Sequence, residues 1–341
     1  MGSISSILKP ACRAVAVFAV AGAFAASAAA QTPPIVMKLA AATINEIQHE
    51  WMKVYAAAIE QGSKGRIKAE IYPASQLGSI PRMIEGTQFG SIQAFVGPPE
   101  FLAGVDSRFE LLSAPGLFKD GAHAIRTFQD PQFNAAFLAL GANRGLKGIG
   151  LFLYGPTVFN TRTPVRKLAD LEGKKIRVLA GAMQTEQIRR LKATPVPMSL
   201  GEVLPALQQG ALDGVMAGVP IFTSMHFYDV AKYLYDSNHL MVASVAVVSK
   251  PWFDKLPPDL QKAVTDAGQK ASKDNYQWAV AFDGQQRDAW IKAGGEIVTP
   301  TQAEHAQIMK LMAPVGAEVT AKKPEQKALY ELLQSAVKRT E

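Results

Sequence analysis

Segments with the periodicity of strands and of helices alternate along the chain, and this order constrains the fold more than any other feature. Residues that alternate between apolar and polar are typical of strands, and apolar residues recurring every three to four positions are typical of helices. By these criteria the first third of the chain carries strands at 35–41, 66–72 and 92–96 and helices at 47–62 and 81–89. This βαβαβ order is typical of a parallel sheet covered by helices on both faces.

The same order begins again in the middle of the chain with strands of its own. We expect strands at 146–154 and 175–179, helices at 186–191 and 202–209, and a short strand or turn at 195–197. A chain of 341 residues is long enough for about two domains, because single cores rarely grow beyond roughly 250 residues. The second set of strands therefore predicts a second α/β lobe.

One predicted helix is much longer than the others. The sequence Leu256-Pro257-Pro258-Asp259 is a strong helix start, and apolar residues continue at helical spacing toward Gly294. At about 1.5 Å per residue such a helix extends roughly 50 Å, which exceeds the diameter of a small domain. We therefore expect this helix to belong to both lobes.

The N-terminus has the pattern of a secretory signal peptide. Lys9 and Arg13 precede an apolar run at 14–26, and small residues follow it, which predicts cleavage near Ala30–Gln31. The single cysteine, Cys12, lies in this segment. Residues 1–30 are therefore expected to direct export to a bacterial periplasm, and the mature chain is expected to carry no thiol.

No catalytic or metal-binding constellation emerges from the mature sequence. The five histidines lack H-x-x-H spacing, and there is no G-x-S-x-G motif. Gly145, Gly148 and Gly150 precede the strand residues 151–154 instead of following a strand and opening a helix, so they indicate a turn into a strand and not a phosphate loop. The basic residues at 189–192 lack interleaved aromatic residues and indicate a solvated helix face. We expect a protein without catalytic residues, metal, cofactor or nucleic-acid partner.

Several ordered motifs carry a family resemblance. They read YPASQLG at 72–78, LEGKKIRV at 171–178, PVPM at 195–198, ALQQGALDGV at 206–215 and LPPDLQ at 256–261. With these motifs, residues 35–300 closely resemble the periplasmic substrate-binding proteins of TRAP transporters, the DctP-like family of tripartite ATP-independent carriers.

The resemblance implies a two-lobed Venus-flytrap fold of the α/β class, with crossing strands as hinge and one long helix spanning both lobes. Lobe I would comprise 31–154 plus about 243–282, and lobe II 155–242 plus about 283–341. It also implies a receptor, expected to be monomeric, that captures an organic acid and delivers it to a small and a large integral membrane subunit.

In the family, the arginine of the K-I-R-V strand binds the ligand carboxylate, and that position is Arg177 here. The chemistry of the side chain agrees with this role. A guanidinium is permanently charged, and its planar fork matches the two oxygens of a carboxylate.

Other positions depart from the family pattern. Thr157 replaces a second arginine, Ala180 an asparagine, Leu200 a phenylalanine, Pro98 an acidic residue, and Met216 with Ala217 the Glu-Asn pair of D-G-x-E-N-P. Each departure removes a polar group or shortens a side chain. A ligand hydroxyl or carboxylate left without a partner costs on the order of 1–3 kcal/mol.

These departures lead to the hypothesis of a monocarboxylate with an apolar or aromatic body. Its carboxylate would lie on Arg177 and its body against Leu200, Met216, Phe159 and Pro98. Arg162 or Arg166 could replace the missing second arginine. The alternatives are a solute-binding protein of another uptake system, for dicarboxylates or sugar acids, and an exported hydrolase.

Overall fold

The computed structural model describes residues 33–341, of which 34–341 form one compact unit. The predicted signal peptide lies outside the described residues. Within 33–341, none of the helices combines the length and the apolar character that crossing a membrane requires.

Five strands form the first sheet, in the order β2-β1-β3-β10-β4. They are β1 (Ile35–Ala41), β2 (Ile67–Tyr72), β3 (Ala94–Gly97), β4 (Leu146–Pro156) and β10 (Met241–Ser249). β1 pairs in parallel with β2 and β3, whereas β10 runs antiparallel to both β3 and β4. The parallel part is the predicted βαβαβ unit, and β10 inserts into the sheet from a distant part of the chain.

The helices that connect the strands of this sheet include both predicted ones. These are α1 (Ile47–Gly62), α2 (Ile80–Phe89), the 3₁₀ helices η1 (Pro99–Leu102), η2 (Ser107–Ser113) and η3 (Ala142–Arg144), and α3 (Gly121–Phe128) and α4 (Pro131–Leu138). The Glu46 carboxylate accepts hydrogen bonds from the first amides of α1, which explains why this helix begins where the periodicity predicts. Gly145 has a φ of 83° immediately before β4, as expected for a turn into a strand, whereas Gly148 and Gly150 lie within β4 and not in the predicted turn.

Six strands form the second sheet, in the order β11-β9-β5-β8-β6-β7. They are β5 (Val158–Thr161), β6 (Lys175–Val178), β7 (Thr194–Pro197), β8 (Gly214–Ala217), β9 (Tyr233–Tyr235) and β11 (Glu296–Val298). The short helices of this part are η4 (Leu168–Leu171), α5 (Ala182–Arg190), η5 (Leu200–Glu202), α6 (Val203–Gln208), α7 (Val219–Ser224) and η6 (Phe227–Asp229). The segment at 195–197, which the sequence leaves open between strand and turn, is part of β7.

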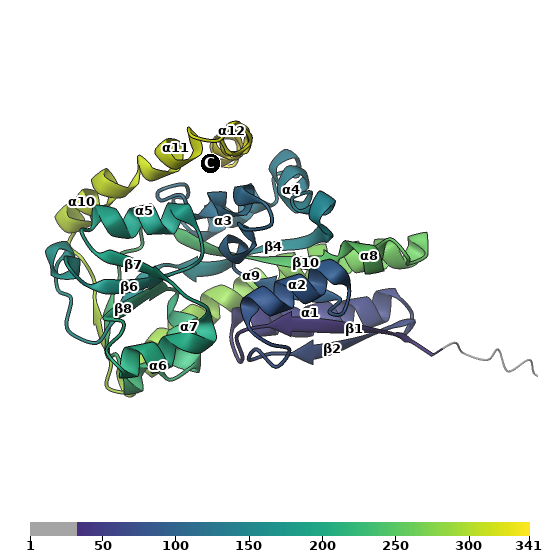
Figure 1. The fold of residues 1–341 in the computed structure, drawn as a ribbon, viewed down its shortest axis with the longest axis horizontal. Coiled ribbons are helices and arrows are strands. Elements are labelled where there is room, and N and C mark those ends of the chain that lie inside the picture. The colour runs from purple at the N-terminus through teal and green to yellow at the C-terminus, as the bar shows by residue number, and fades with distance from the viewer. Residues whose placement is uncertain (1–32) are drawn as a thin grey trace, which may run out of the picture. The chain divides into compact units, whose positions relative to one another are not determined.

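The chain passes between the two sheets at three places. Thr157 separates β4 from β5, and the segment 236–240 connects β9 to β10. These two crossings are hydrogen-bonded to each other, since the amide of Thr157 donates to Leu240 and its carbonyl accepts from Asn238. After α8 (Lys250–Phe253), the 35-residue helix α9 (Pro258–Lys292) contacts α1 and β4 as well as α7 and β11 (Figure 1). The predicted long helix shared by both lobes is confirmed.

Three C-terminal helices run along one side of the structure (Figure 1). α10 (Gln302–Met312) and α11 (Val315–Thr320) pack on α5, whereas α12 (Pro324–Arg339) packs on α3, α4 and η2. The sequence-based boundaries assign all of 283–341 to the second lobe, and they remain a prediction. The packing of α12 adds that the last helix lies against elements that precede β4.

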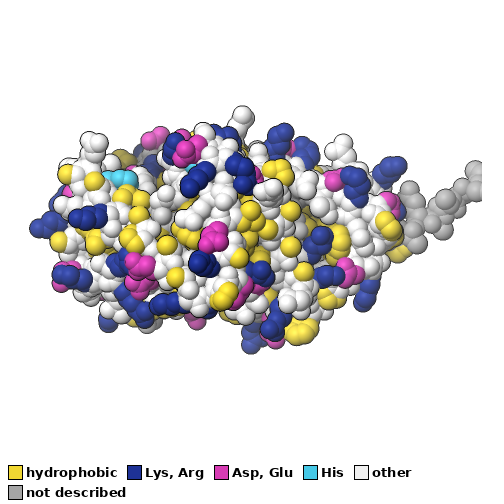
Figure 2. Space-filling view, turned by 90° about the horizontal axis from the view of Figure 1, so that it is seen from above, with side chains coloured by type: hydrophobic (Ala, Val, Ile, Leu, Met, Phe, Trp, Pro, Cys, Tyr) yellow, Lys and Arg dark blue, Asp and Glu magenta, His cyan; other side chains and the backbone are white. Residues whose placement is uncertain are grey.

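Charged side chains of both signs are interspersed on the face shown in Figure 2. The basic segment 189–192 fits this pattern, because Arg190 pairs with Glu186 and Glu318, and Lys192 pairs with Glu172. These residues are therefore part of a mixed, solvated surface.

Candidate functional site

A pocket lies where the carboxyl ends of strands from the two sheets approach each other. Twenty residues line it, from the ends of β1, β3, β6 and β8, from the crossing strands, and from α1, α2, α5 and α7: Ala42, Thr43, Gln48, Ile80, Phe95, Val96, Gly97, Pro98, Phe101, Tyr154, Thr157, Arg177, Leu179, Gln184, Leu200, Met216, Ala217, Gly218, Ile221 and Val242. The space between them is about 580 Å³, part of it open to solvent. This position, at strand ends between two sheets, is typical of small-molecule sites.

Arg177 is the one lining residue with a permanent charge. It is the third residue of β6, an interior strand of the second sheet, and only 2% of its surface is exposed. Its Nε donates a hydrogen bond of 3.0 Å to the carbonyl of Met198, which fixes the orientation of the guanidinium. No Asp or Glu among the described residues forms an ion pair with Arg177. The fork of the guanidinium therefore keeps its capacity to bind a carboxylate.

The electrostatic environment of Arg177 is that of a cation held in a low-dielectric site. Burial lowers the pKa of Arg177 to about 10, and the negative charge of Glu100 opposes this shift. The side chain thus remains positive at neutral pH. The ring of Phe101 lies 5.8 Å from the guanidinium carbon, at a distance suited to a cation–π contact.

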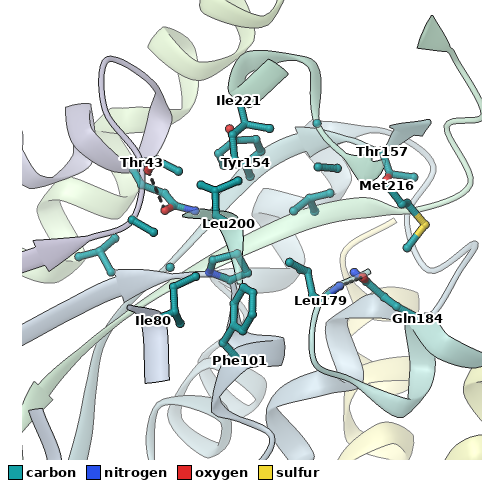
Figure 3. A pocket seen from close by; sticks show the side chains of 18 of the residues that line it. Thr43, Ile80, Phe101, Tyr154, Thr157, Leu179, Gln184, Leu200, Met216 and Ile221 are labelled. Carbon is teal, nitrogen blue, oxygen red and sulfur yellow. Dashed lines mark hydrogen bonds between the residues drawn. The ribbon is translucent and has the colours of Figure 1, made fainter. Parts of the chain in front are cut away.

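Six of the eight residues that the sequence assigns to ligand binding line this pocket. They are Arg177, Thr157, Leu200, Met216, Ala217 and Pro98. Figure 3 shows Thr157 and Met216 on one side of the pocket and Thr43 and Ile80 on the other. The structure brings these six residues together around one pocket. Their contact with a ligand stays a prediction.

Phe159 and Ala180 do not line the pocket, which departs from the expectation. The ring of Phe159 is buried in the core of the second sheet and stacks on His239, with 5.7 Å between centroids. Ala180 is exposed, whereas its neighbour Leu179 lines the pocket. Successive residues of an extended segment point in opposite directions, so the side chain that faces the pocket is the one before Ala180.

Neither Arg162 nor Arg166 reaches the pocket. Arg166 forms an exposed ion pair of 2.7 Å with Glu296 on β11. Arg162 lies near Gly210, and its amide donates to the carbonyl of Asp213. A second arginine therefore does not supplement Arg177 in the pocket of this structure.

Several polar lining residues escape the sequence reasoning, and most of them are hydrogen-bonded within the protein. Gln48 accepts from Thr43 at 3.1 Å and donates to Ser244 at 3.1 Å. Gln184 accepts from the amide of Leu179 at 2.9 Å and donates to Ser113 at 3.3 Å. Their position in the first turn of the helix that follows a strand is the one signal in the sequence that could have indicated them.

The hydroxyl of Thr157 differs from the side-chain amides of Gln48 and Gln184, because it forms no hydrogen bond with another described residue. Apolar side chains form most of the remaining wall. The hydroxyl of Tyr154, another lining residue, also has no hydrogen-bond partner among the described residues. The pocket thus combines one cation, two free hydroxyls and an apolar lining. Two α/β sheets joined by crossing strands and a shared helix, with such a pocket between them, define a two-lobed solute-binding protein.

Comparison with known proteins identifies the family. Residues 40–323 match the model of bacterial extracellular solute-binding protein, family 7, and the chain belongs to this family. The 2,3-diketo-L-gulonate-binding periplasmic protein YiaO of Escherichia coli (strain K12) is 31% identical over 255 residues, which cover 74% of this chain and 77% of that protein. The family is one of binding proteins and not of enzymes, and its members bind small organic acids and work with membrane subunits.

Solved structures agree with this assignment. A TRAP periplasmic solute-binding protein from Desulfovibrio salexigens, with bound orotic acid, has a TM-score of 0.85 and 26% identity, covering 90% of this chain and 99% of that one. Another from Xanthobacter autotrophicus Py2, with bound β-D-galacturonate, has a TM-score of 0.81 and 27% identity, covering 88% and 99%. The predicted two-lobed fold and the predicted TRAP solute-binding class are confirmed.

Proposed function

We propose that this protein is a periplasmic receptor that binds a monocarboxylate with an apolar or aromatic body and delivers it to the membrane subunits of a TRAP transporter. The carboxylate lies on the guanidinium of Arg177, and the body of the ligand lies between the apolar walls of the pocket. Catalysis plays no part in this function.

The observation that carries the proposal is a buried arginine without an ion-pair partner among the described residues. Moving a cation out of water costs several kcal/mol unless a counter-ion or hydrogen bonds compensate. Arg177 has a single protein hydrogen bond, to Met198. A carboxylate ligand supplies two charge-assisted hydrogen bonds to the free fork and neutralises the charge.

The walls of the pocket favour an apolar ligand body. Ile80, Leu200 and Ile221 line the space together with the ring of Phe101, whereas the side chain of Met216 packs on Phe159 in the core of the second sheet. Each ligand hydroxyl buried against such a wall without a partner costs about 1–3 kcal/mol. The hydroxyls of Thr157 and Tyr154 provide two sites for polar substituents, which is fewer than a sugar acid requires.

The ligands named for the relatives are all organic acids, which supports an organic acid as the ligand of this protein. These acids differ in how many polar groups they carry. Orotic acid, bound to the Desulfovibrio salexigens protein, is a flat ring with a single carboxyl group, as in the proposed class, and its two ring carbonyls and two N–H groups are polar. Galacturonate and diketogulonate, named for two other relatives, are acids with several hydroxyl or carbonyl groups. Sugar acids are therefore the main competing class, and a binding measurement distinguishes the two.

Delivery requires that the membrane subunits distinguish the loaded receptor from the empty one. A ligand that contacts both lobes shifts the population toward a closed arrangement by its differential affinity. Residues from both sheets line the pocket, so a ligand there touches both lobes. We also propose that the mature receptor is a monomer that begins near Gln31, which N-terminal sequencing and light scattering of the exported protein test.

A thermal-shift and calorimetric screen tests the proposed ligand class. Benzoate, phenylacetate and orotate are compared with succinate and galacturonate, using wild-type protein and the variant Arg177→Met. A ligand at about 100 times its dissociation constant stabilises the folded state by roughly 2.7 kcal/mol, which a thermal shift detects. We expect benzoate, phenylacetate and orotate to stabilise the wild-type protein and not the variant Arg177→Met. Much tighter binding of succinate or galacturonate contradicts the apolar class, and binding unchanged in Arg177→Met contradicts the site.

A further inference from the structure

A buried carboxyl group lies close enough to the cation of the pocket for the two charges to interact. Glu100 belongs to η1, two residues beyond Pro98, and 2% of its surface is exposed. Its Oε1 accepts a hydrogen bond from the hydroxyl of Ser113, and its Oε2 has no hydrogen-bond partner among the described residues. A carboxylate buried with an unsatisfied oxygen is costly, and protonation removes most of that cost.

The charges around Glu100 come from two neighbouring elements. Arg177 on β6 attracts its negative charge without forming an ion pair, and Glu110 on η2 repels it. The charged residues of α2, Arg82 and Glu85, are exposed, and β10 carries no titratable side chain. Burial raises the pKa of Glu100 to about 7, with Arg177 acting against the shift and Glu110 reinforcing it.

Glu110 is a matched comparison within the same cluster. One oxygen of its carboxylate accepts a hydrogen bond of 3.1 Å from the amide of Met183, and the other accepts one of 2.9 Å from the amide group of Gln326. Both oxygens of Glu110 thus have hydrogen-bond donors. Glu100 lacks this arrangement, because its Oε2 has no donor among the described residues.

We propose that binding of a carboxylate at Arg177 is coupled to the uptake of one proton by Glu100. With Glu100 ionised, Arg177 and Glu100 together carry no net charge, and an arriving carboxylate leaves an excess negative charge in a buried site. A proton taken from solvent by Glu100 removes that added negative charge. The inference rests on the proposed carboxylate site at Arg177 and adds that a protonated Glu100 is part of the loaded state.

The coupling fixes the direction of the pH dependence. The ligand's negative charge raises the pKa of Glu100 above its value in the empty pocket, so the loaded protein holds a proton that the empty protein releases as pH rises through about 7. Affinity is therefore constant at acidic pH and falls as pH rises above 7, by at most about tenfold per pH unit for one proton. It becomes constant again once the loaded form also loses the proton.

Calorimetric titration with benzoate at pH 6, 7, 8 and 9, in two buffers of different ionisation enthalpy, measures the number of protons taken up. We expect an uptake approaching one at pH 8 in wild type and none in Glu100→Gln, whose affinity no longer depends on pH in this range. Ser113→Ala removes a hydrogen bond that favours the ionised form of Glu100, so the affinity should begin to fall at a higher pH. Glu110→Gln removes a repelling charge and moves the fall to lower pH. Binding without proton uptake in wild type overturns the inference and leaves the carboxylate site intact.

If benzoate does not bind, the proposed ligand class fails, and the coupling is still tested in the empty protein. The free energy of unfolding is then measured from pH 5 to 9 for wild type, Arg177→Met and Glu100→Gln. In wild type we expect the free energy of unfolding to fall as Glu100 loses its proton, and Glu100→Gln should lack this fall. In Arg177→Met the fall should occur at higher pH, because this variant lacks the positive charge that favours ionised Glu100. An identical titration in wild type and Arg177→Met overturns the inference.

Discussion

Two arginines with little exposed surface, Arg177 and Arg287, lie in opposite electrostatic environments. On α9, Arg287 donates to both oxygens of Asp236, at 2.9 and 3.2 Å, and to Asp283 at 2.8 Å. On β6, Arg177 donates to one backbone carbonyl and forms no ion pair with a described residue. Burial lowers the pKa of Arg287, but hydrogen bonds and charges from the two aspartates outweigh it, whereas burial dominates and lowers the pKa of Arg177.

The difference separates a structural cation from a binding one. Asp236 lies in the segment that connects β9 to β10, so Arg287 joins the shared helix to a crossing between the sheets. Its donors are used within the protein. Arg177 lines a pocket, and its guanidinium forms no ion pair with a described residue. We expect a carboxylate ligand to supply the stabilising negative charge.

Replacing Arg177 is expected to have the largest effect. The replacement should weaken ligand binding without lowering the stability of the fold. Truncating one member of a buried, hydrogen-bonded charge pair typically costs about 2–5 kcal/mol of binding free energy. Arg177→Met should lose at least that much for benzoate in calorimetric titration. Its free energy of unfolding should equal or exceed that of wild type, because a desolvated cation is replaced by an apolar side chain. A variant that binds normally would contradict the binding role of Arg177, and a variant that fails to fold would assign Arg177 a structural role.

Removing Arg287 is expected to have the reverse effect. Arg287→Met leaves Asp236 and Asp283 without their cation, and it should lower the free energy of unfolding by about 2 kcal/mol. This is less than the 3–5 kcal/mol typical of fully buried pairs, because about a fifth of the Arg287 side chain is exposed. Denaturant unfolding measures the loss, and benzoate affinity at fixed pH serves as the control. Lost affinity in a fully folded Arg287→Met would break the comparison.

Glu100 should make stability depend on pH even without ligand. Its pKa is raised from 4.5 to about 7 by burial, so its stabilising contribution is complete below pH 4.5 and is lost as pH rises toward 7. Relative to Glu100→Gln, wild type should therefore lose on the order of 1–3 kcal/mol between pH 5 and 8. Urea unfolding of both proteins across this range gives the difference. Parallel curves for the two proteins would mean that Glu100 stays in one protonation state.

The smallest effect is expected at Arg166, whose ion pair with Glu296 is exposed. Such pairs contribute about 0–1 kcal/mol. Arg166→Ala should therefore change stability by less than about 1 kcal/mol and benzoate affinity by less than about twofold. A large loss of affinity would show that Arg166 moves into the pocket when ligand binds.

Periodicity in the sequence predicts the elements whose boundaries are encoded locally. The strand Ile35–Ala41 and the helix Ile47–Gly62 have the predicted bounds, and the long helix ends within two residues of Gly294. In contrast, the insertion of β10 into the first sheet and the packing of α12 on α3 and α4 depend on contacts between distant segments. No local pattern encodes such pairings.

The candidate site divides in the same way. A motif on one strand indicates Arg177, whereas Gln48 and Glu100 come near it through the topology of the other sheet, from segments about 75 to 130 positions earlier in the chain. Phe159 illustrates a further limit, because an apolar residue near a predicted site packs equally well in the core. Its ring lies on His239 and not in the pocket.

A crystal structure of the protein with benzoate tests the central claim most directly. We expect both carboxylate oxygens within about 3 Å of the Arg177 guanidinium nitrogens and the ring of benzoate against Leu200 and Phe101. Benzoate whose carboxylate lies away from Arg177, or outside this pocket, would contradict the assignment of Arg177 as the anion-binding residue.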